Sequence, residues 1–205
     1  NATALLAFVL DSAKCAQDVT ALVHVAWSEE FDDLEEYLQE FTKFYEVFQT
    51  AIGDTTALME LDRENSVLAR ILYANVISAM ETYLADTVRK QVLNRPSIQR
   101  RFVRSHDAFK EKKMPVSSIL DRVDTLKDEI ATEIDKMSFH NLEKIPGLYK
   151  AVLDTDFPKD QMANLQEAVR NRHDIVHRNG KNTSGRRIEV CMADVGVLIT
   201  LVTDV

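Results

Sequence analysis

Glycine and proline are scarce in this chain. Its 205 residues include five Gly and four Pro, whereas 45% are apolar and 28% are charged. A β-sandwich or barrel needs many tight turns, which these two residue types commonly form. The apolar content suffices for a packed core, which excludes a chain that is mainly disordered. The composition therefore predicts an all-α fold.

Cysteine is scarce as well. Cys15 and Cys191 are too few for a disulfide framework or a zinc site built from cysteines. They fit a reducing cytoplasm, and we expect both to be buried as small apolar side chains. The apolar residues 1–10 lack the basic lead and cleavage site of a secretory signal, and they are too few to span a bilayer. We expect a cytoplasmic protein with no membrane association.

Positive charge is in deficit overall but is locally concentrated. The net charge of −8 argues against nonspecific binding of nucleic acid by the whole surface. However, residues 89–113 carry a net charge of +7 and residues 170–187 a net charge of +5. Eleven acidic residues lie between Glu29 and Asp62, where we expect a solvated helix face. Two basic segments therefore interrupt an acidic protein.

Hydrophobic periodicity predicts helices through the first half of the chain. Residues 3–26 contain no turn former, and aromatic and aliphatic residues recur every three or four positions from Phe31 to Phe48. We expect Gly53 to end that second helix, whose aromatic stripe is interpreted as core or dimer interface rather than as a base-stacking platform. Residues 56–93 contain neither Gly nor Pro and predict a long central helix, closed by residues 94–96 (NRP).

The second half predicts shorter helices. One begins at residues 115–118, and an apolar piece over residues 142–153 is broken by Pro146 and Gly147. Another begins within residues 156–160, with Pro158 in its first turn, and ends at Gly180 in a left-handed conformation. A last apolar segment covers residues 188–205, and its first four residues could be extended.

A carboxylate interrupts the apolar stripe of the central helix. Glu81 shares that stripe with Ala74, Ile77, Leu84 and Val88. A carboxylate in such a place needs a cation or several hydrogen-bond donors. A structural ion pair and a role in an active site are both open.

One segment concentrates cationic and titratable side chains near a helix end. Residues 170–180 read RNRHDIVHRNG, which stacks His173 and His177 at positions i and i+4. Arg172 and His177 lie about 140° apart around a helix and about 7.5 Å apart along it, so they can flank one groove. Ile175 and Val176 would anchor the helix to the core.

These residue types suit phosphoryl transfer. Arg presents a planar fork that matches phosphate oxygens, and histidine as a residue type titrates near neutrality. Solvated charges with a local Asp174–Arg178 pair are one alternative. Two metal ligands at His173 and His177 are another, although the glutamate of the metalloprotease helix is missing. Walker, dinucleotide-binding and serine-nucleophile motifs are absent.

The segment from Arg172 to Gly180 resembles the Arg-x4-His signature of HEPN domains. Residues 80–84 (METYL) and 139–142 (FHNL) resemble the RiboL-PSP-type branch of that superfamily, and the resemblance covers roughly residues 58–205. It implies an all-α helical bundle over residues 56–205 with a long central helix. Residues 1–55 would then be an N-terminal helical extension packed on the bundle.

The resemblance also implies roles for individual residues. His177 would be the acid/base group, Arg172 would stabilise phosphate charge, and His173 would orient the site. Glu81 would pair with Arg172. The implied reaction is metal-independent cleavage of single-stranded RNA to 2′,3′-cyclic phosphate and 5′-hydroxyl ends, with no cofactor. Asn179 stands where families paired with a nucleotidyltransferase carry Tyr, so regulation by modification of that Tyr is not expected.

The partners implied are RNA and a second copy of the chain. Arg104, Lys112, Lys113, Arg178 and Asn179 are the candidates for contacts with RNA. Members of the family usually dimerise through the signature helix, and many act in toxin, antiphage or stress responses. An antitoxin or fused neighbouring domains are further partners left open. The alternative function is a catalytically silent HEPN module that dimerises or senses nucleotides within a larger protein.

Overall fold

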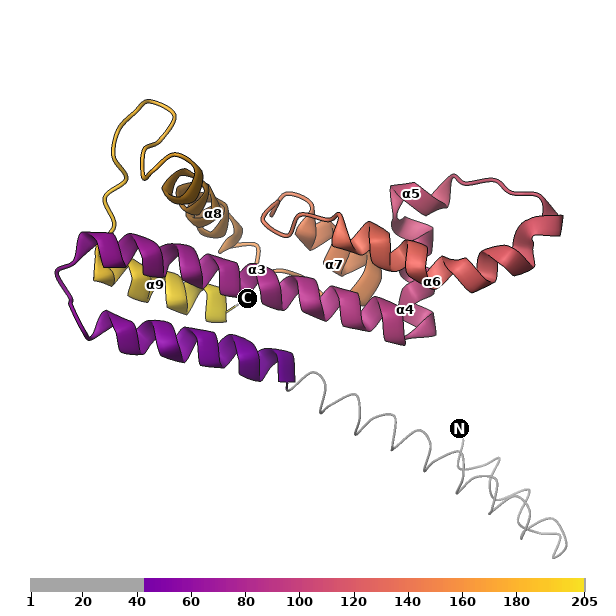
Figure 1. Ribbon diagram of the computed structural model, residues 1–205, viewed down its shortest axis with the longest axis horizontal. Helices are drawn as coiled ribbons and strands as arrows, with labels where there is room; N and C mark the ends of the chain where they lie inside the picture. The colour runs from indigo at the N-terminus through magenta and orange to yellow at the C-terminus, as the bar shows by residue number, and fades with distance from the viewer. Residues whose placement is uncertain (1–42, 205) are drawn as a thin grey trace, which may run out of the picture. The chain divides into compact units, whose positions relative to one another are not determined.

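The computed structural model describes residues 43–204, and these are helical throughout, apart from their connections. After a helix over residues 43–59 come α3 (Ser66–Asn94), α4 (Pro96–Ser105), α5 (Asp107–Lys110), the 3-10 turn η1 (Val116–Ser118), α6 (Ile119–Asp135), α7 (Ile145–Leu153), α8 (Met162–His177) and α9 (Met192–Thr203) (Figure 1). Within this part of the chain, one isolated bridge between Lys181 and Arg187 is the only β pairing. The predicted all-α fold is confirmed.

Helix α3 is the central element of the bundle. It is 29 residues long, and α4, α6, α7, α8 and α9 all pack against it (Figure 1). The helix begins where Asn65 Oδ1 accepts hydrogen bonds from the backbone N–H groups of Val67 and Leu68. It ends at Asn94, as Pro96 requires. A helix covered on several sides needs apolar residues around much of its circumference, which explains the long apolar run in the sequence.

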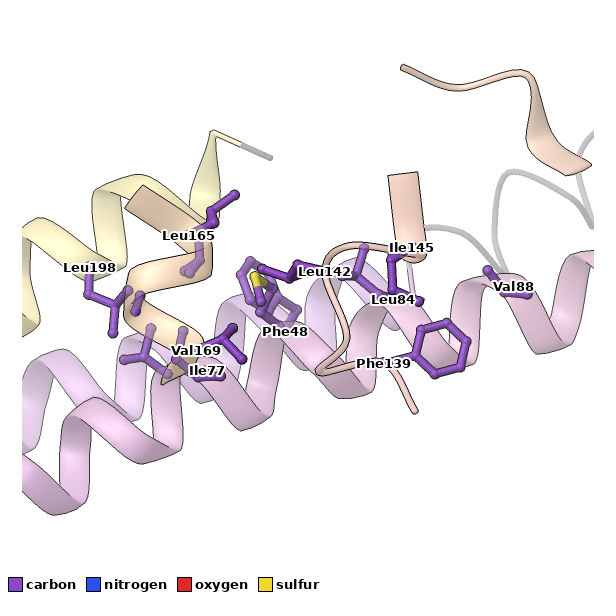
Figure 2. Packing of buried hydrophobic residues seen from close by; sticks show 14 of the residues in the cluster. Phe48, Ile77, Leu84, Val88, Phe139, Leu142, Ile145, Leu165, Val169 and Leu198 are labelled. Carbon is purple, nitrogen blue, oxygen red and sulfur yellow. The ribbon is translucent and has the colours of Figure 1, made fainter. Parts of the chain in front are cut away.

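The core forms around α3 from side chains that are far apart in the sequence. Figure 2 shows a cluster that includes Ile77, Leu84 and Val88 of α3, Phe139, Leu142 and Ile145 near the start of α7, Leu165 and Val169 of α8, and Leu198 of α9. Tyr149 adds a polar link, since its buried hydroxyl donates a hydrogen bond of 2.8 Å to the carbonyl of Leu84. The core therefore fixes α8 against α3, where the candidate site lies.

The helix over residues 43–59 packs against α3. The ring of Phe48 is buried and stacks on that of Tyr83 with 5.3 Å between centroids. Thr55 is also buried, and its Oγ1 accepts a hydrogen bond of 2.9 Å from Asn75 Nδ2. The end of the aromatic stripe thus contributes to the core. The predicted helix over residues 3–26 and the earlier part of the stripe lie outside the described residues.

Two predicted boundaries in the first half were wrong. Gly53 does not end its helix, which continues to residue 59, because nothing crowds Gly53 and Ile52 and Thr55 remain buried on either side of it. The central helix begins at Ser66 rather than near residue 56. The polar residues 60–65 separate the two helices, and Asn65 supplies the cap.

The predicted positions of two prolines relative to the helices in the second half were wrong. Pro146 and Gly147 do not break a helix, since they lie in the first turn of α7, where a missing N–H costs nothing. Pro158 precedes α8 instead of lying in its first turn, and its carbonyl accepts a hydrogen bond from the backbone of Gln161. Helix α6 does start at the predicted place, and residues 188–191 form no strand.

Cys191 is exposed, which corrects the expectation that it is buried. It is the N-cap of α9, and its backbone N–H donates to Asp194 Oδ2 at 2.8 Å. Because this N-cap position faces solvent, the side chain of Cys191 is exposed. Cys15 lies outside the described residues. None of the helices within residues 43–204 is long and apolar enough to cross a membrane.

Candidate active site on helix α8

Helix α8 is anchored to the core by one face. Leu165, Ala168 and Val169 are buried on that face, and Arg172 follows one turn later on the same side. Arg172 therefore points toward α3, whereas His173 and His177 are exposed. The spacing of the motif therefore places Arg172 on the side of α8 that faces α3, and it leaves His173 and His177 exposed to solvent.

Arg172 is held by two side chains of α3. Its Nη2 lies 3.6 Å from Glu81 Oε2 and donates a hydrogen bond of 3.4 Å to Ser78 Oγ. The side chains of Arg172 and Glu81 are 19% and 14% exposed, so the pair is largely shielded from water. The expected pairing of Glu81 with Arg172 is present. Ser78 is a further neighbour that the sequence analysis did not identify, because a serine in a helix gives no local sign of a partner on another helix.

The ion pair is incompletely satisfied within the described residues. Arg172 Nε and Glu81 Oε1 are both buried there without a hydrogen-bond partner. Burial raises the pKa of the Glu81 carboxyl above its ordinary range, and this effect outweighs the opposing pull of Arg172 and His140. His140 is the weaker of these two opposing influences on Glu81. It belongs to the segment over residues 139–142 that resembled the family, although the sequence indicated no role for it.

His173 and His177 form a pair of exposed rings at the end of α8. Their ring centroids are 4.7 Å apart and the rings are tilted by 47°. His177 is the last residue of the helix. Within residues 43–204 no group of three or more His, Cys, Asp and Glu side chains is arranged to hold a metal ion. The two histidines therefore have no third ligand of this kind in the described part of the chain.

The chain leaves α8 through a tightly bonded turn. The carbonyl of Asp174 accepts hydrogen bonds from the backbone N–H groups of Arg178 and Gly180, at 3.0 and 3.1 Å. Asn179 and Gly180 both have positive φ, 53° and 75°, so the left-handed residue predicted at Gly180 is confirmed. Arg178 also forms the predicted pair with Asp174, at 2.7 Å.

The structure does not bring all the RNA-binding candidates together. Arg178 and Asn179 adjoin His177, but Arg104, Lys112 and Lys113 belong to α4 and the segment after α5. Helix α4 begins fifteen residues beyond Glu81 along α3, a distance of about 22 Å. Lys112 also lies 3.6 Å from Glu129, which partly neutralises it. These three residues are therefore remote from Arg172 and His177 within one chain.

Comparison with protein families supports the resemblance seen in the sequence. The family described as RiboL-PSP-HEPN matches residues 32–204. The match begins inside the segment predicted to be an N-terminal extension, and the domain boundary after residue 55 stays a prediction. No curated protein and no solved structure matches the chain. Since the family match covers most of the sequence and agrees with the all-α bundle, the chain belongs to the RiboL-PSP-HEPN family.

Proposed function

We propose that the chain is a metal-independent endoribonuclease that cleaves single-stranded RNA and acts as a toxin, antiphage or stress-response effector. The observation that carries the proposal is the placement of Arg172 and His177 on α8. Arg172 is fixed against Ser78 and Glu81, while His177 is exposed at the helix end. A fixed guanidinium and an exposed imidazole on one helix, able to flank a common groove, form an arrangement suited to phosphoryl transfer.

The proposed reaction assigns each group a step. The ribose 2′-oxygen attacks the adjacent phosphorus as His177 accepts its proton, and the bond from phosphorus to the 5′-oxygen breaks as that oxygen takes a proton from water or from a protonated His177 of the second copy. The products are a 2′,3′-cyclic phosphate and a 5′-hydroxyl. Arg172 stabilises the charge on the phosphate oxygens. Its Nη1 is suited to this task, because Nη2 is engaged by Glu81 and Ser78.

His173 and Glu81 act as positioning residues in this proposal. The ring of His173 lies against that of His177 and limits its orientation. Glu81 opposes the positive charge of Arg172 from α3 and keeps the guanidinium at one place. Both would therefore affect the rate through the residue that they hold.

We propose that two copies of the chain form the complete site, with their α8 helices meeting at a two-fold axis. Val176, which directly precedes His177, is 50% exposed and so does not anchor α8 to the core as predicted, and Val67 of α3 is 54% exposed. Exposed apolar side chains beside a polar site favour a protein contact there. Such a contact would place His177 and Arg172 of both chains around one groove.

The test is cleavage of a labelled single-stranded RNA pool in excess EDTA. We expect the wild type to produce cyclic-phosphate ends, and Arg172→Ala and His177→Ala to lower the rate by at least about a hundredfold. Arg100→Ala is the matched control, because Arg100 is exposed on α4 and remote from α8. Activity that survives His177→Ala would reject the assignment. Cleavage that needs a divalent ion would favour the alternative in which His173 and His177 are metal ligands. No cleavage under any condition would favour a catalytically silent HEPN module.

A mixing experiment tests the composite site. If Arg172 of one chain works with His177 of its partner, mixing the Arg172→Ala and His177→Ala proteins creates heterodimers with one intact site. Random exchange would restore about a quarter of the wild-type activity. No recovery, under conditions where exchange is demonstrated, would reject that division of the site between two chains.

A further inference from the structure

A second group of cations lies just beyond the end of α8. Arg70, Lys181 and Arg187 line a pocket of about 420 Å³, together with Ile71, Ile175 and Gly180. Helix α3, the end of α8 and the following loop each contribute one of its walls. The pocket therefore joins positive charge to an apolar surface, and it adjoins the Arg-x4-His motif through Ile175 and includes Asn179, one of the predicted RNA contacts.

The loop after α8 is folded so that two of these cations share a face. Lys181 and Arg187 form an antiparallel bridge, and directly opposite residues in such a bridge project their side chains to the same side. Asn182 closes the loop, since its backbone N–H donates to the Arg186 carbonyl at 2.9 Å and its Oδ1 accepts from the N–H groups of Ser184 and Arg186. The backbone positions that carry both cations are thus ordered by the loop itself.

Arg70 brings the third cation from α3. A methyl group added to Gly180 would lie 3.6 Å from Arg70 Cδ and 3.7 Å from its Nε, so the side chain runs beside the glycine backbone. Its Nη1 is buried and has no hydrogen-bond partner among the described residues. Within residues 43–204 no carboxylate forms an ion pair with Arg70, Lys181 or Arg187. Three cations without a carboxylate partner within residues 43–204, together with one buried donor that lacks an acceptor there, point to an anionic ligand.

We propose that this pocket binds a nucleotide phosphate. Arg and Lys supply the donors that phosphate oxygens accept, and Ile71 and Ile175 supply an apolar wall for the attached nucleoside. Gly180 follows His177 by three residues, so their Cα atoms are at most about 11 Å apart. That the phosphate belongs to the RNA strand cut at His177 rests on the proposed function. A free mononucleotide offers the same chemistry.

The test is binding of a labelled single-stranded RNA whose 2′-hydroxyls are all methylated, followed by fluorescence anisotropy at several salt concentrations. This strand cannot be cleaved by 2′-oxygen attack, so binding is measured apart from catalysis. The variants are Arg187→Gln and Lys181→Gln, with Arg186→Gln as the matched control. Arg186 is exposed, adjoins Arg187 and does not line the pocket. A parallel calorimetric titration with 5′-AMP distinguishes a mononucleotide from a strand.

We expect Arg187→Gln and Lys181→Gln each to weaken binding of the strand about tenfold and to lower its salt dependence, while Arg186→Gln changes affinity less than about twofold. If 5′-AMP binds and the strand does not, with the same loss in Arg187→Gln, the ligand is a free nucleotide. Equal effects of Arg186→Gln and Arg187→Gln, or no binding of either ligand, would overturn the proposal. A protein that cleaves no RNA but loses binding in Arg187→Gln would reject the ribonuclease and support the pocket.

Discussion

Arg172 of α8 and Glu81 of α3 face each other across a largely buried interface, with 3.6 Å between Nη2 and Oε2. The contact joins the signature helix to the central helix at the same place where Ser78 accepts a hydrogen bond from Arg172. Nε of the arginine and Oε1 of the glutamate remain without partners within the described residues. The pair therefore holds the guanidinium in place, but burial of the carboxylate offsets part of the stability gained.

The pH dependence of folding should report this burial. The pKa of Glu81 in the folded protein is raised above 4.5, its ordinary value in an unfolded chain. Between the unfolded and the folded pKa, the folded protein therefore keeps a proton that the unfolded chain has lost. The contribution of Glu81 to the free energy of unfolding is complete below pH 4.5 and falls as the pH rises through the raised pKa. We expect the wild type to lose stability relative to Glu81→Gln from pH 4 to pH 7, measured by urea unfolding.

Asp135→Asn serves as a control for that experiment. Its carboxyl is exposed and pairs with Arg89 at 2.9 Å on the surface, so it lacks the burial on which the prediction depends. We expect it to leave the pH trend of the wild type in place. If the wild type instead gains stability over Glu81→Gln as the pH rises, attraction to Arg172 outweighs burial and the prediction is wrong.

Two glycines should respond to alanine in opposite directions. Gly180 has φ of +75° at the end of α8, so Gly180→Ala should cost about 1–2 kcal/mol of unfolding free energy. Gly147 lies in α7 with open space around its Cα, so Gly147→Ala should add about 0.5–1 kcal/mol. Chemical denaturation of both variants checks this, and a stabilising Gly180→Ala would show that the helix end relaxes to another conformation.

The sequence allowed much of the fold and part of the site to be predicted. Periodicity and scarce turn residues indicated the all-α bundle, and a carboxylate at position 81 in an apolar stripe indicated a buried partner. The ends of the helices were harder to predict. Gly53 lies inside a helix, and Pro146 lies in the first turn of one, where proline is tolerated. Gly180 did end its helix as predicted, whereas Gly53 and Gly147 lie within helices, so a glycine alone does not show where a helix ends.

Long-range contacts account for what the sequence did not reveal. Arg70 precedes Gly180 by more than a hundred residues, and only the packing of α3 on α8 places them in contact. Ser78 also looks ordinary in the sequence, since a serine on a helix commonly bonds to the preceding turn. Arg104 and Lys112 stay predicted RNA contacts, but the length of α3 that separates them from His177 could not be foreseen from their charge.

Tyr149 should stabilise the bundle through its hydroxyl. The group is buried and donates to the Leu84 carbonyl at 2.8 Å, and burial raises the pKa of this tyrosine, so the donor keeps its proton. Tyr149→Phe should lower the free energy of unfolding by about 1–2 kcal/mol. Tyr45→Phe is the matched control, since Tyr45 is 49% exposed and should change stability by less than about 0.5 kcal/mol. Equal effects in thermal or urea unfolding would contradict the role given to the buried bond.

Ser78 should affect catalysis more than stability. Its Oγ accepts a hydrogen bond from Arg172 Nη2 and also donates to the Ala74 carbonyl, so Ser78→Ala removes one of two groups that hold the guanidinium. In the proposed ribonuclease we expect kcat to fall roughly threefold to tenfold, because a hydrogen bond as long as 3.4 Å contributes only about 0.5–1.5 kcal/mol even with a charged donor. KM should change little, since the serine is not expected to touch RNA.

Two further variants separate positioning from a general structural effect. Ser105→Ala removes a hydroxyl that also bonds to the carbonyl four residues earlier but that lies on α4, away from Arg172. It should leave kcat unchanged. Ser78→Thr keeps the hydroxyl and should recover most of the rate. If Ser78→Ala and Ser105→Ala lower kcat equally, or if Ser78→Ala changes only the unfolding free energy, Ser78 does not position Arg172. Arg172 would then depend on Glu81 alone among the contacts with α3 described here.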